Sequence, residues 1–176
     1  MTQSGLRVLV TGACGLVGKA TVAQLRARGF HVTATDLDTP AGRKTISRLA
    51  TQTRDLPGTL AVEWVDLTDD AAVGALVARV KPDAIVHLAA VIPPFCYENR
   101  TPARAVNVGG TRSLVAAAAS LDTPPRFVQT SSIAVYGPRN PYAGKGLLRP
   151  DTPVNPRDLY GRSEERRVGK ECRALC

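Results

Sequence analysis

Three glycines stand at intervals of three near the N-terminus, between an apolar segment and a segment with helical periodicity. They are Gly12, Gly15 and Gly18, and they follow the apolar run at 7–11. In a loop of this kind the first glycine permits a tight turn, the second lets the backbone approach a pyrophosphate, and the third allows close helix–sheet packing. The start of the next helix adds unpaired N–H groups and a partial positive charge. The spacing predicts a dinucleotide-binding loop, and a purely structural turn is the alternative.

Asp36 ends the second apolar segment, a position from which a carboxylate can bind the adenosine ribose hydroxyls of a dinucleotide. A carboxylate there also repels a 2′-phosphate, so the residue favours NAD over NADP. Arg43 and Lys44 follow a few residues later and could turn toward a phosphate. Their alternative role is that of solvated side chains on a helix face.

None of the cysteines has CxxC spacing, and the chain holds only two histidines. We therefore expect no metal site and, in a reducing cytosol, free thiols at all four cysteines. Cys14 lies in the glycine loop near the start of a helix, where a lowered thiol pKa would make it sensitive to oxidation. Plain packing is the alternative for Cys14. The others are Cys96, Cys172 and Cys176.

Apolar segments alternate with helical ones along most of the chain. We expect strands at 7–11, 31–36, 60–65, 83–89 and 126–131, and helical segments at 17–28, near 69–81 and near 101–121. Such alternation predicts an α/β fold of Rossmann type, in which a doubly wound parallel sheet is covered on both faces. The segment 137–157, rich in proline and glycine, is expected to be a long irregular loop.

The composition is that of an ordinary globular protein. The chain has 176 residues, a length that suits one domain, and a net charge of +8. Its basic residues are spread singly and have no aromatic residues between them, so we expect no nucleic-acid partner. No apolar run is long enough to span a membrane and no secretory signal is visible, so a cytoplasmic location is expected.

Several further motifs occur in the order typical of one family. Besides the glycine loop and Asp36, they are Val65-Asp66-Leu67, His87-Leu88-Ala89-Ala90, Asn107-Val108-x-Gly110-Thr111, Ser131-Ser132-x-x-Val135-Tyr136-Gly137 and Tyr160-Gly161. Over about residues 6–161 the chain resembles the extended short-chain dehydrogenase/reductase family, the NAD-dependent epimerases and dehydratases. The motif set is specific for this family but not for one substrate.

The resemblance implies roles along the cofactor. Asp66 and Leu67 would border the adenine, Ala89 and Ala90 would lie along the cofactor, and Asn107 would order the active-site backbone. A helix N-cap is the alternative for Asp66, and a satisfied buried amide is the alternative for Asn107. His87 is assigned to packing. The full set implied for NAD is Gly12, Cys14, Gly15, Leu16, Val17, Gly18, Asp36, Asp66, Leu67, Leu88, Ala89, Ala90 and Asn107.

Two catalytic residues are implied as well. Ser132, just past the fifth strand, would hydrogen-bond the reacting oxygen, with Ser131 as the alternative. Tyr160 would move the proton, because oxidation of an alcohol needs a base while hydride passes to the nicotinamide. A free phenol has a pKa of about 10. The family supplies a lysine four residues later, which lowers this pKa and holds the nicotinamide ribose.

Glu164 stands where the family has that lysine. A carboxylate there would raise the phenol pKa instead of lowering it. From residue 162 the sequence also loses the apolar periodicity of a packed helix, and residues 162–173 resemble the in-frame translation of a sequencing adapter. We therefore expect a partial dinucleotide-binding Rossmann domain over 1–161 and a non-native tail over 162–176.

The leading hypothesis is an NAD-dependent epimerase/dehydratase-type oxidoreductase that acts on a sugar nucleotide or similar alcohol by hydride transfer. A reductase or dehydrogenase of a non-sugar carbonyl is the second hypothesis, favoured by the apolar loop at 91–97. A non-catalytic dinucleotide-binding protein is the third. Because the family continues well beyond this length, we expect an incomplete sheet, a missing substrate region and an inactive fragment with an unprotected edge. The expected partners are a small-molecule substrate and, for the intact protein, a second copy in a homodimer.

Overall fold

Five parallel strands form one sheet in the order β3-β2-β1-β4-β5. The computed structural model describes residues 5–138, 146–149 and 151–169. The chain begins at the centre of the sheet, builds outward to β3, and returns to add β4 and β5 on the other side of β1. This is the order of a doubly wound Rossmann-type sheet, and it confirms the predicted fold class. The strands are β1 (Arg7–Thr11), β2 (His31–Asp36), β3 (Leu60–Trp64), β4 (Ala84–His87) and β5 (Arg126–Gln129).

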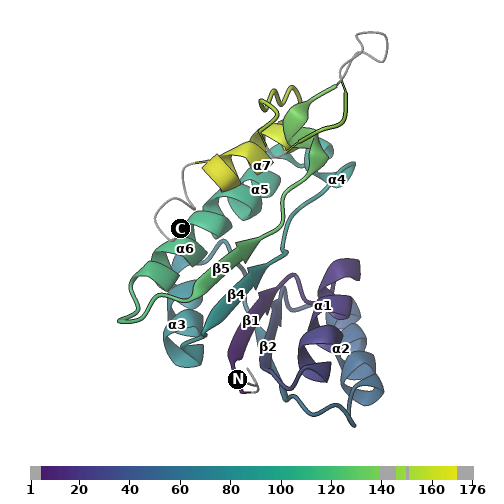
Figure 1. The fold of residues 1–176 in the computed structure, drawn as a ribbon, viewed down its shortest axis with the longest axis vertical. Coiled ribbons are helices and arrows are strands. Elements are labelled where there is room, and N and C mark those ends of the chain that lie inside the picture. The colour runs from purple at the N-terminus through teal and green to yellow at the C-terminus, as the bar shows by residue number, and fades with distance from the viewer. Residues whose placement is uncertain (1–4, 139–145, 150, 170–176) are drawn as a thin grey trace.

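Helices cover both faces of the sheet. Figure 1 shows α1 and α2 on one side and α3, α5 and α6 on the other. No helix in the described part of the chain is long and apolar enough to span a membrane. The helices are α1 (Leu16–Ala27), α2 (Pro40–Gln52), α3 (Asp70–Val80), α4 (Phe95–Glu98), α5 (Arg100–Arg104), the π-helix η1 (Ala105–Gly110), α6 (Thr111–Ala119), the 3₁₀-helix η2 (Ile133–Tyr136) and α7 (Leu159–Gly169).

Successive side chains of the central strand β1 pack into two separate hydrophobic cores, one on each face of the sheet. Val8 and Val10 of β1 are buried in the core beneath α1 and α2, whereas Leu9 is buried in the core beneath α3 and α6. This follows from the two-residue period of a strand, which sends successive side chains to opposite faces. Burial on both faces explains why β1 is a continuous apolar run.

Two helices start at side-chain caps. Thr39 accepts a hydrogen bond from the N–H of Gly42 at the start of α2, and Asp69 accepts one from the N–H of Ala72 at the start of α3. Such caps satisfy N–H groups that have no partner within the helix. The α2 helix was not among the predicted segments, although Thr39-Pro40 is a typical helix start.

The fourth strand is shorter than the prediction of 83–89. β4 ends at His87 because the next two N–H groups, those of Leu88 and Ala89, turn toward the side chain of Thr11. The predicted helix near 101–121 is present but divided into α5, η1 and α6. A π-helical turn widens the backbone locally and is often found at functional sites.

The chain continues as a helix across the boundary expected at residue 161. α7 runs to Gly169, although the sequence from residue 162 lacks the apolar periodicity of a packed helix. Its inward-facing residues include Ser163 and Glu164, which are buried although polar. Apolar periodicity alone therefore missed this helix. The non-native origin of the tail stays a prediction.

Candidate functional site

A cavity of about 540 Å³ opens at the carboxyl ends of β1, β2, β3 and β4. Ligands of doubly wound sheets bind at this edge, where the chain changes direction between β1 and β4. Nine of the thirteen expected cofactor-binding residues line the cavity. They are Gly12, Cys14, Gly15, Asp36, Asp66, Leu67, Leu88, Ala89 and Ala90.

The glycine loop needs its glycines for two different reasons. Gly12 has a positive φ of 67°, and a Cβ there would stand 2.7 Å from the backbone nitrogen of Ala89. Gly18 does not line the cavity. Instead, a Cβ on Gly18 would overlap the carbonyl oxygen of Gly12, so this glycine lets α1 pack onto the turn. Both observations match the roles expected from the spacing.

The first turn of α1 faces the loop without a side-chain cap or an acidic residue. A helix start of this kind leaves N–H groups and a partial positive charge for a pyrophosphate. Leu16 and Val17 lie in this turn with exposed side chains that do not line the cavity. The groups of this turn suited to a pyrophosphate are therefore its backbone N–H groups.

Asp36 is fixed by two backbone groups. One carboxylate oxygen accepts the N–H of Cys14 over 2.8 Å, and the other accepts the N–H of Leu37 over 2.8 Å. Each carboxylate oxygen has a further lone pair that could accept a ribose hydroxyl. The carboxylate therefore links the glycine loop to the end of β2 and still suits the role assigned to it.

The thiol of Cys14 is less reactive than an ordinary thiol, whereas the sequence raised the possibility of a more reactive one. Burial, followed by the charge of Asp36 and a hydrogen bond to it, raises the pKa of the thiol to about 12. The start of α1 does not activate it, so the lowered-pKa interpretation was wrong and the packing alternative stands. Cys14 lines the cavity and lies close to Gly42 of α2, whose carbonyl accepts from the thiol.

Asp66 is not a helix N-cap, because Asp69 holds that position for α3. Asp66 instead closes a short turn by accepting hydrogen bonds from the N–H and the hydroxyl of Thr68. Asp66 and Leu67 both line the cavity wall on the β3 side. Their placement agrees with a border for the adenine.

His87 is completely buried between two threonines, in line with its assignment to packing. The hydroxyl of Thr111 donates to the carbonyl of Asn107, so it must accept from Nε2–H of His87 at 2.9 Å. In the neutral ring, Nδ1 then accepts from the hydroxyl of Thr11 over 2.6 Å. Thr11 in turn accepts the N–H groups of Leu88 and Ala89, which fixes the cavity floor.

The side-chain amide of Asn107 makes two hydrogen bonds to the backbone of Val91, one through its oxygen and one through its nitrogen. Its carbonyl oxygen accepts the N–H of Val91 over 2.7 Å, and its NH₂ group donates to the Val91 carbonyl over 3.0 Å. The same NH₂ group donates to the hydroxyl of Ser163 in α7. Val91 lines the first cavity, so Asn107 orders its wall from behind rather than touching its contents.

The two expected catalytic residues do not line the first cavity. Tyr160 lines a second cavity of about 490 Å³ together with Asn107, Cys96 and Arg104. Ser132 caps η2 by accepting the N–H of Ala134. The elements that carry them nevertheless touch, because a Cβ on Gly161 would stand 2.5 Å from the carbonyl oxygen of Ala134.

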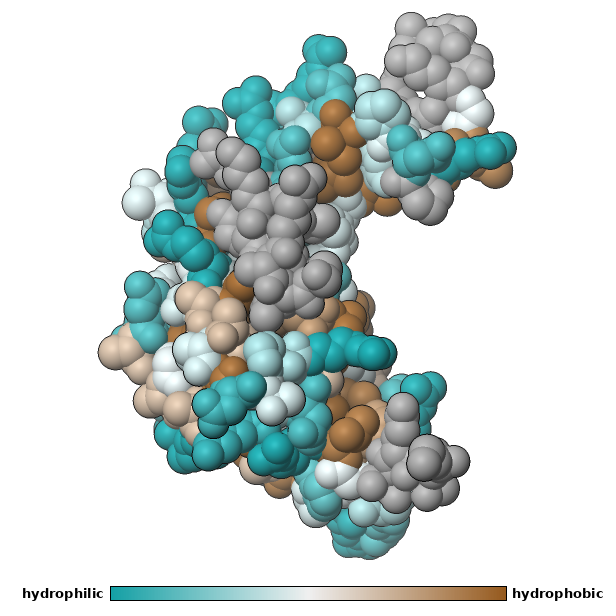
Figure 2. All heavy atoms as spheres, turned by 60° about the vertical axis from the view of Figure 1, so that its left-hand side comes forward, coloured by the Kyte–Doolittle hydropathy of each residue, from teal (hydrophilic) through white to brown (hydrophobic). Residues whose placement is uncertain are grey.

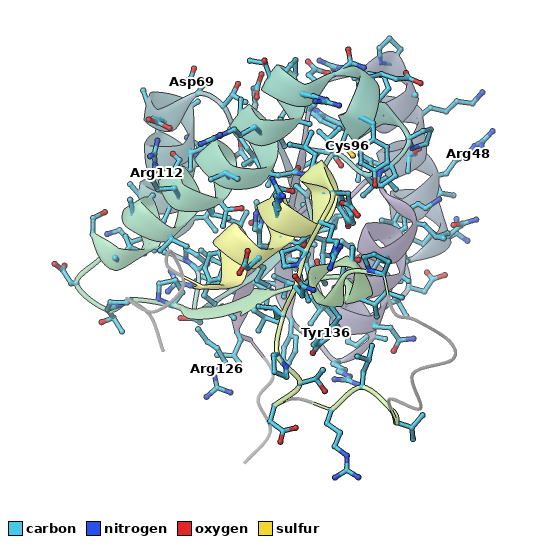
Figure 3. The ribbon with its side chains drawn as sticks, turned by 90° about the horizontal axis from the view of Figure 1, so that it is seen from above. Arg48, Asp69, Cys96, Arg112, Arg126 and Tyr136 are labelled. Carbon is cyan, nitrogen blue, oxygen red and sulfur yellow. The ribbon has the colours of Figure 1, made fainter. Side chains whose placement is uncertain are left out.

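Seen from above in Figure 3, Tyr136 of η2 lies on one side of α7 and Cys96 on another. In the same view Arg48, Arg112 and Arg126 lie at separate edges of the molecule. These three arginines therefore do not form one basic patch. Among the described residues no group of three or more His, Cys, Asp or Glu side chains is arranged to hold a metal ion.

Sequence reasoning missed a second group of cavity residues. Half of them come from the β2–α2 connection and the first two turns of α2: Leu37, Thr39, Ala41, Gly42 and Thr45. The others are Thr11, Thr35, Val65, Val91 and Val106. The signal that would have found the first five is the Thr39-Pro40 helix start, three residues after Asp36. It would have placed a second helix N-terminus beside the site.

The strand order and the glycine loop define a Rossmann-type α/β protein. The chain belongs to the NAD dependent epimerase/dehydratase family, whose model matches residues 8–166. It is 31% identical over 165 residues to a UDP-glucose 4-epimerase of Oryza sativa subsp. japonica, an alignment that covers 89% of this chain and 42% of the relative.

Two solved structures share the fold. The UDP-Glc/GlcNAc 4-epimerase of Campylobacter jejuni has a TM-score of 0.78 and 27% identity over 93% of this chain and 47% of its own. The Bordetella bronchiseptica enzyme WbmH, solved in complex with NAD⁺, has a TM-score of 0.73 and 28% identity over 93% of this chain and 50% of its own. The chain thus spans about half the length of these relatives.

Proposed function

We propose that this chain is the NAD-binding part of an epimerase or dehydratase that acts on a sugar nucleotide. The observation that carries the proposal is the 540 Å³ cavity, where the glycine loop, Asp36 and Asp66 meet at one edge of the sheet. The residues fit the cofactor. Gly12 has no side chain between the backbone and the cavity, and the first turn of α1 has no side-chain cap on its N–H groups. The carboxylate of Asp36 is held in place by the N–H of Cys14. The sugar-nucleotide substrate is supported by the UDP-sugar epimerases among the relatives.

NAD would supply the hydride acceptor for transient oxidation of the substrate. Residues of this chain would bind the cofactor. Asp36 would bind the adenosine ribose, and the first turn of α1 would bind the pyrophosphate. Ser132 and Tyr160 are the proposed groups for the reacting oxygen and its proton. Their elements touch through Gly161 and Ala134, which supports the assignment.

Glu164 supports the expectation that the chain with this sequence has no catalytic activity. Its side chain is 1% exposed and lies one helical turn beyond Tyr160, where a cation would be needed to lower the phenol pKa. We therefore expect NAD binding without reduction of NAD by alcohols. Formation of NADH by this chain in the presence of a UDP-sugar would contradict the expected inactivity.

NAD binding can be measured through the single tryptophan of the chain, Trp64, which ends β3 directly before the cavity residue Val65. Titration with NADH should quench Trp64 emission and produce saturable energy transfer to the nicotinamide. Gly12→Ala should abolish the signal, because its Cβ would meet the backbone of Ala89. The matched control is Gly74→Ala in α3, where the added methyl meets nothing within 4 Å. An unsaturable signal in the unmodified chain would overturn the proposal.

A second candidate function is the reduction of a non-sugar carbonyl. The loop that follows β4 leaves Ile92 57% exposed and Phe95 60% exposed. Figure 2 shows a concave hollow on one side of the molecule with hydrophobic side chains on part of its wall. Apolar surface of this kind suits an apolar substrate better than a sugar diphosphate. Binding of a steroid-like ketone but not of UDP-glucose to the NAD-bound chain would favour this alternative.

A third candidate is a non-catalytic dinucleotide-binding protein, which the buried Glu164 supports. Glu164→Lys separates this candidate from the first. If the substitution creates turnover of a UDP-sugar, the enzyme proposal gains support. If NAD binds equally well with and without the substitution and no turnover appears, the binding role is favoured.

A further inference from the structure

Asp38 and Arg43 form an ion pair with two hydrogen bonds in the connection between β2 and α2 and the first turn of α2. Nε of Arg43 donates to Oδ1 of Asp38 over 2.6 Å, and Nη2 donates to Oδ2 over 2.5 Å. The guanidinium carbon also lies 5.8 Å from the ring centroid of Trp64. The two hydrogen bonds to the carboxylate and the contact with the Trp64 ring together restrict the guanidinium, so it has little freedom to bind another group.

The pair lies at the ribose end of the proposed site. Asp38 is two residues beyond Asp36, and its two neighbours, Leu37 and Thr39, both line the cavity. Gly42, the residue before Arg43, lines it as well. Both partners of the ion pair are therefore carried by backbone that borders the end of the cavity where Asp36 would bind the ribose, although neither partner is itself a lining residue.

The pair contributes little to the fold itself. The side chain of Arg43 is 62% exposed and that of Asp38 is 46% exposed, and exposed ion pairs add little stability because water and salt screen them. Hydrogen bonding to Arg43 holds the pKa of the Asp38 carboxyl below its usual range, so the carboxylate is charged at neutral pH. Replacing Asp38 should thus leave the fold intact and change the electrostatics at the ribose end.

We infer that Asp38 is a specificity-determining residue that enforces NAD over NADP by occupying Arg43. An unrestrained arginine at this position would pair with a 2′-phosphate through the same two-point fork that it now gives to Asp38. The 2′-phosphate would also be repelled by the carboxylate of Asp36, which lines the cavity and is present in every Asp38 and Arg43 variant alike. The inference rests on the proposed NAD-binding function and assigns its selectivity to a second acidic residue.

The test compares dissociation constants of NADH and NADPH for the full chain and for Asp38→Asn, using Trp64 energy transfer. The ratio of NADPH to NADH affinity should rise about tenfold in the variant, because a charge-assisted pair to the phosphate becomes available. The gain should shrink as salt is added. It should disappear in the double variant Asp38→Asn/Arg43→Ala, since the arginine is the group that binds the phosphate.

Asp55→Asn is the matched control, because Asp55 also pairs with an arginine, Arg54, on the exposed surface, but neither chain neighbour of Asp55 lines the cavity. This variant should keep the original cofactor ratio. An unchanged ratio in Asp38→Asn, with NADH still bound, would overturn the inference and leave the proposed function standing. So would a gain that survives Arg43→Ala. A chain that binds neither dinucleotide would overturn both. A thermal unfolding curve of each variant identifies any loss of fold.

Discussion

The backbone N–H of Cys14 donates to the carboxylate of Asp36 over 2.8 Å, which joins the glycine loop to the second strand across 22 residues of sequence. One carboxylate thereby orders the loop and also faces the cavity. Asp36 therefore has a structural and a ligand-binding role, and the two can be separated by experiment.

Asp36→Asn should weaken NADH binding about tenfold or more, because the charge-assisted hydrogen bonds to the ribose hydroxyls become neutral ones. Asparagine keeps one acceptor oxygen, which can still hold the N–H of Cys14, and the N–H of Leu37, whose bond to Asp36 is exposed, can turn to water instead. Thermal unfolding should therefore change little. Titration of NADH against Trp64 emission gives the affinity. Equal affinity in the variant and in the unmodified chain would remove Asp36 from the site.

Cys14 should resist alkylation. Its pKa of about 12, against an ordinary value of 9.0, leaves about a thousandfold less thiolate at neutral pH than a free thiol has. Iodoacetamide rates measured with Cys96, Cys172 and Cys176 replaced by serine should rise with pH up to about 12. Asp36→Asn should speed the reaction, since the charge of Asp36 helps to raise this pKa. A fast reaction at pH 7 would contradict the assignment.

The same shift predicts a pH dependence of stability. The folded-state pKa of Cys14 lies above the unfolded-state pKa, so folding favours the protonated thiol. The stabilisation is present below pH 9.0 and is lost as the pH rises from there to about 12. Urea unfolding of the unmodified chain should show a steeper loss across this window than Cys14→Ser, which does not titrate there. Parallel curves would contradict the prediction.

Gly18→Ala and Gly74→Ala should have opposite effects on the free energy of unfolding. The added methyl of Gly18→Ala would overlap the Gly12 carbonyl, so we expect a loss of about 1–3 kcal/mol. Gly74 lies within α3 and has open space around it. Alanine there should stabilise the helix by about 0.5–1 kcal/mol. Urea unfolding measures both, and equal signs would contradict the packing described for α1.

Asn107→Asp should destabilise the protein by about 1–3 kcal/mol, because the substitution replaces the donor to the Val91 carbonyl with a buried carboxylate oxygen. Asn99→Asp is the control, since the amide of Asn99 makes an exposed hydrogen bond to Phe95. That control should change the free energy of unfolding by less than about 0.5 kcal/mol. Comparable losses in the two variants would show that Asn107 does not hold the cavity wall.

Self-association should depend on β5, which lies at the end of the sheet with Val128 47% exposed. Exposed strand edges pair readily with other chains, and charged side chains prevent this. Val128→Lys should therefore lower the average mass found by sedimentation velocity at high concentration. Leu147→Lys, at an exposed position outside any strand, should not. The same mass distribution in all three proteins would exclude the edge as the contact.

Local sequence patterns determined the sheet, because each strand of a doubly wound fold is an apolar run and each crossover is a helix with its own start and end signals. The starts of β1, β2, β3 and β5 agree with the expectation, and β4 differs by one residue. The glycine loop and Asp36 could be recognised because their roles depend on backbone geometry that glycine and a strand end impose locally.

Only the tertiary structure decided the pKa, the pairing and the burial of individual side chains. The raised pKa of Cys14 results from burial and from Asp36, which are set by how the loop folds against β2 and α2. The pairing of Arg43 with Asp38 and Trp64 likewise depends on where α2 places the guanidinium. Ser163 of α7, a buried polar residue that the apolar pattern could not reveal, accepts a hydrogen bond from Asn107 of η1. Hydrogen bonds and charges act between segments distant in sequence, so their outcome is fixed only when those segments meet.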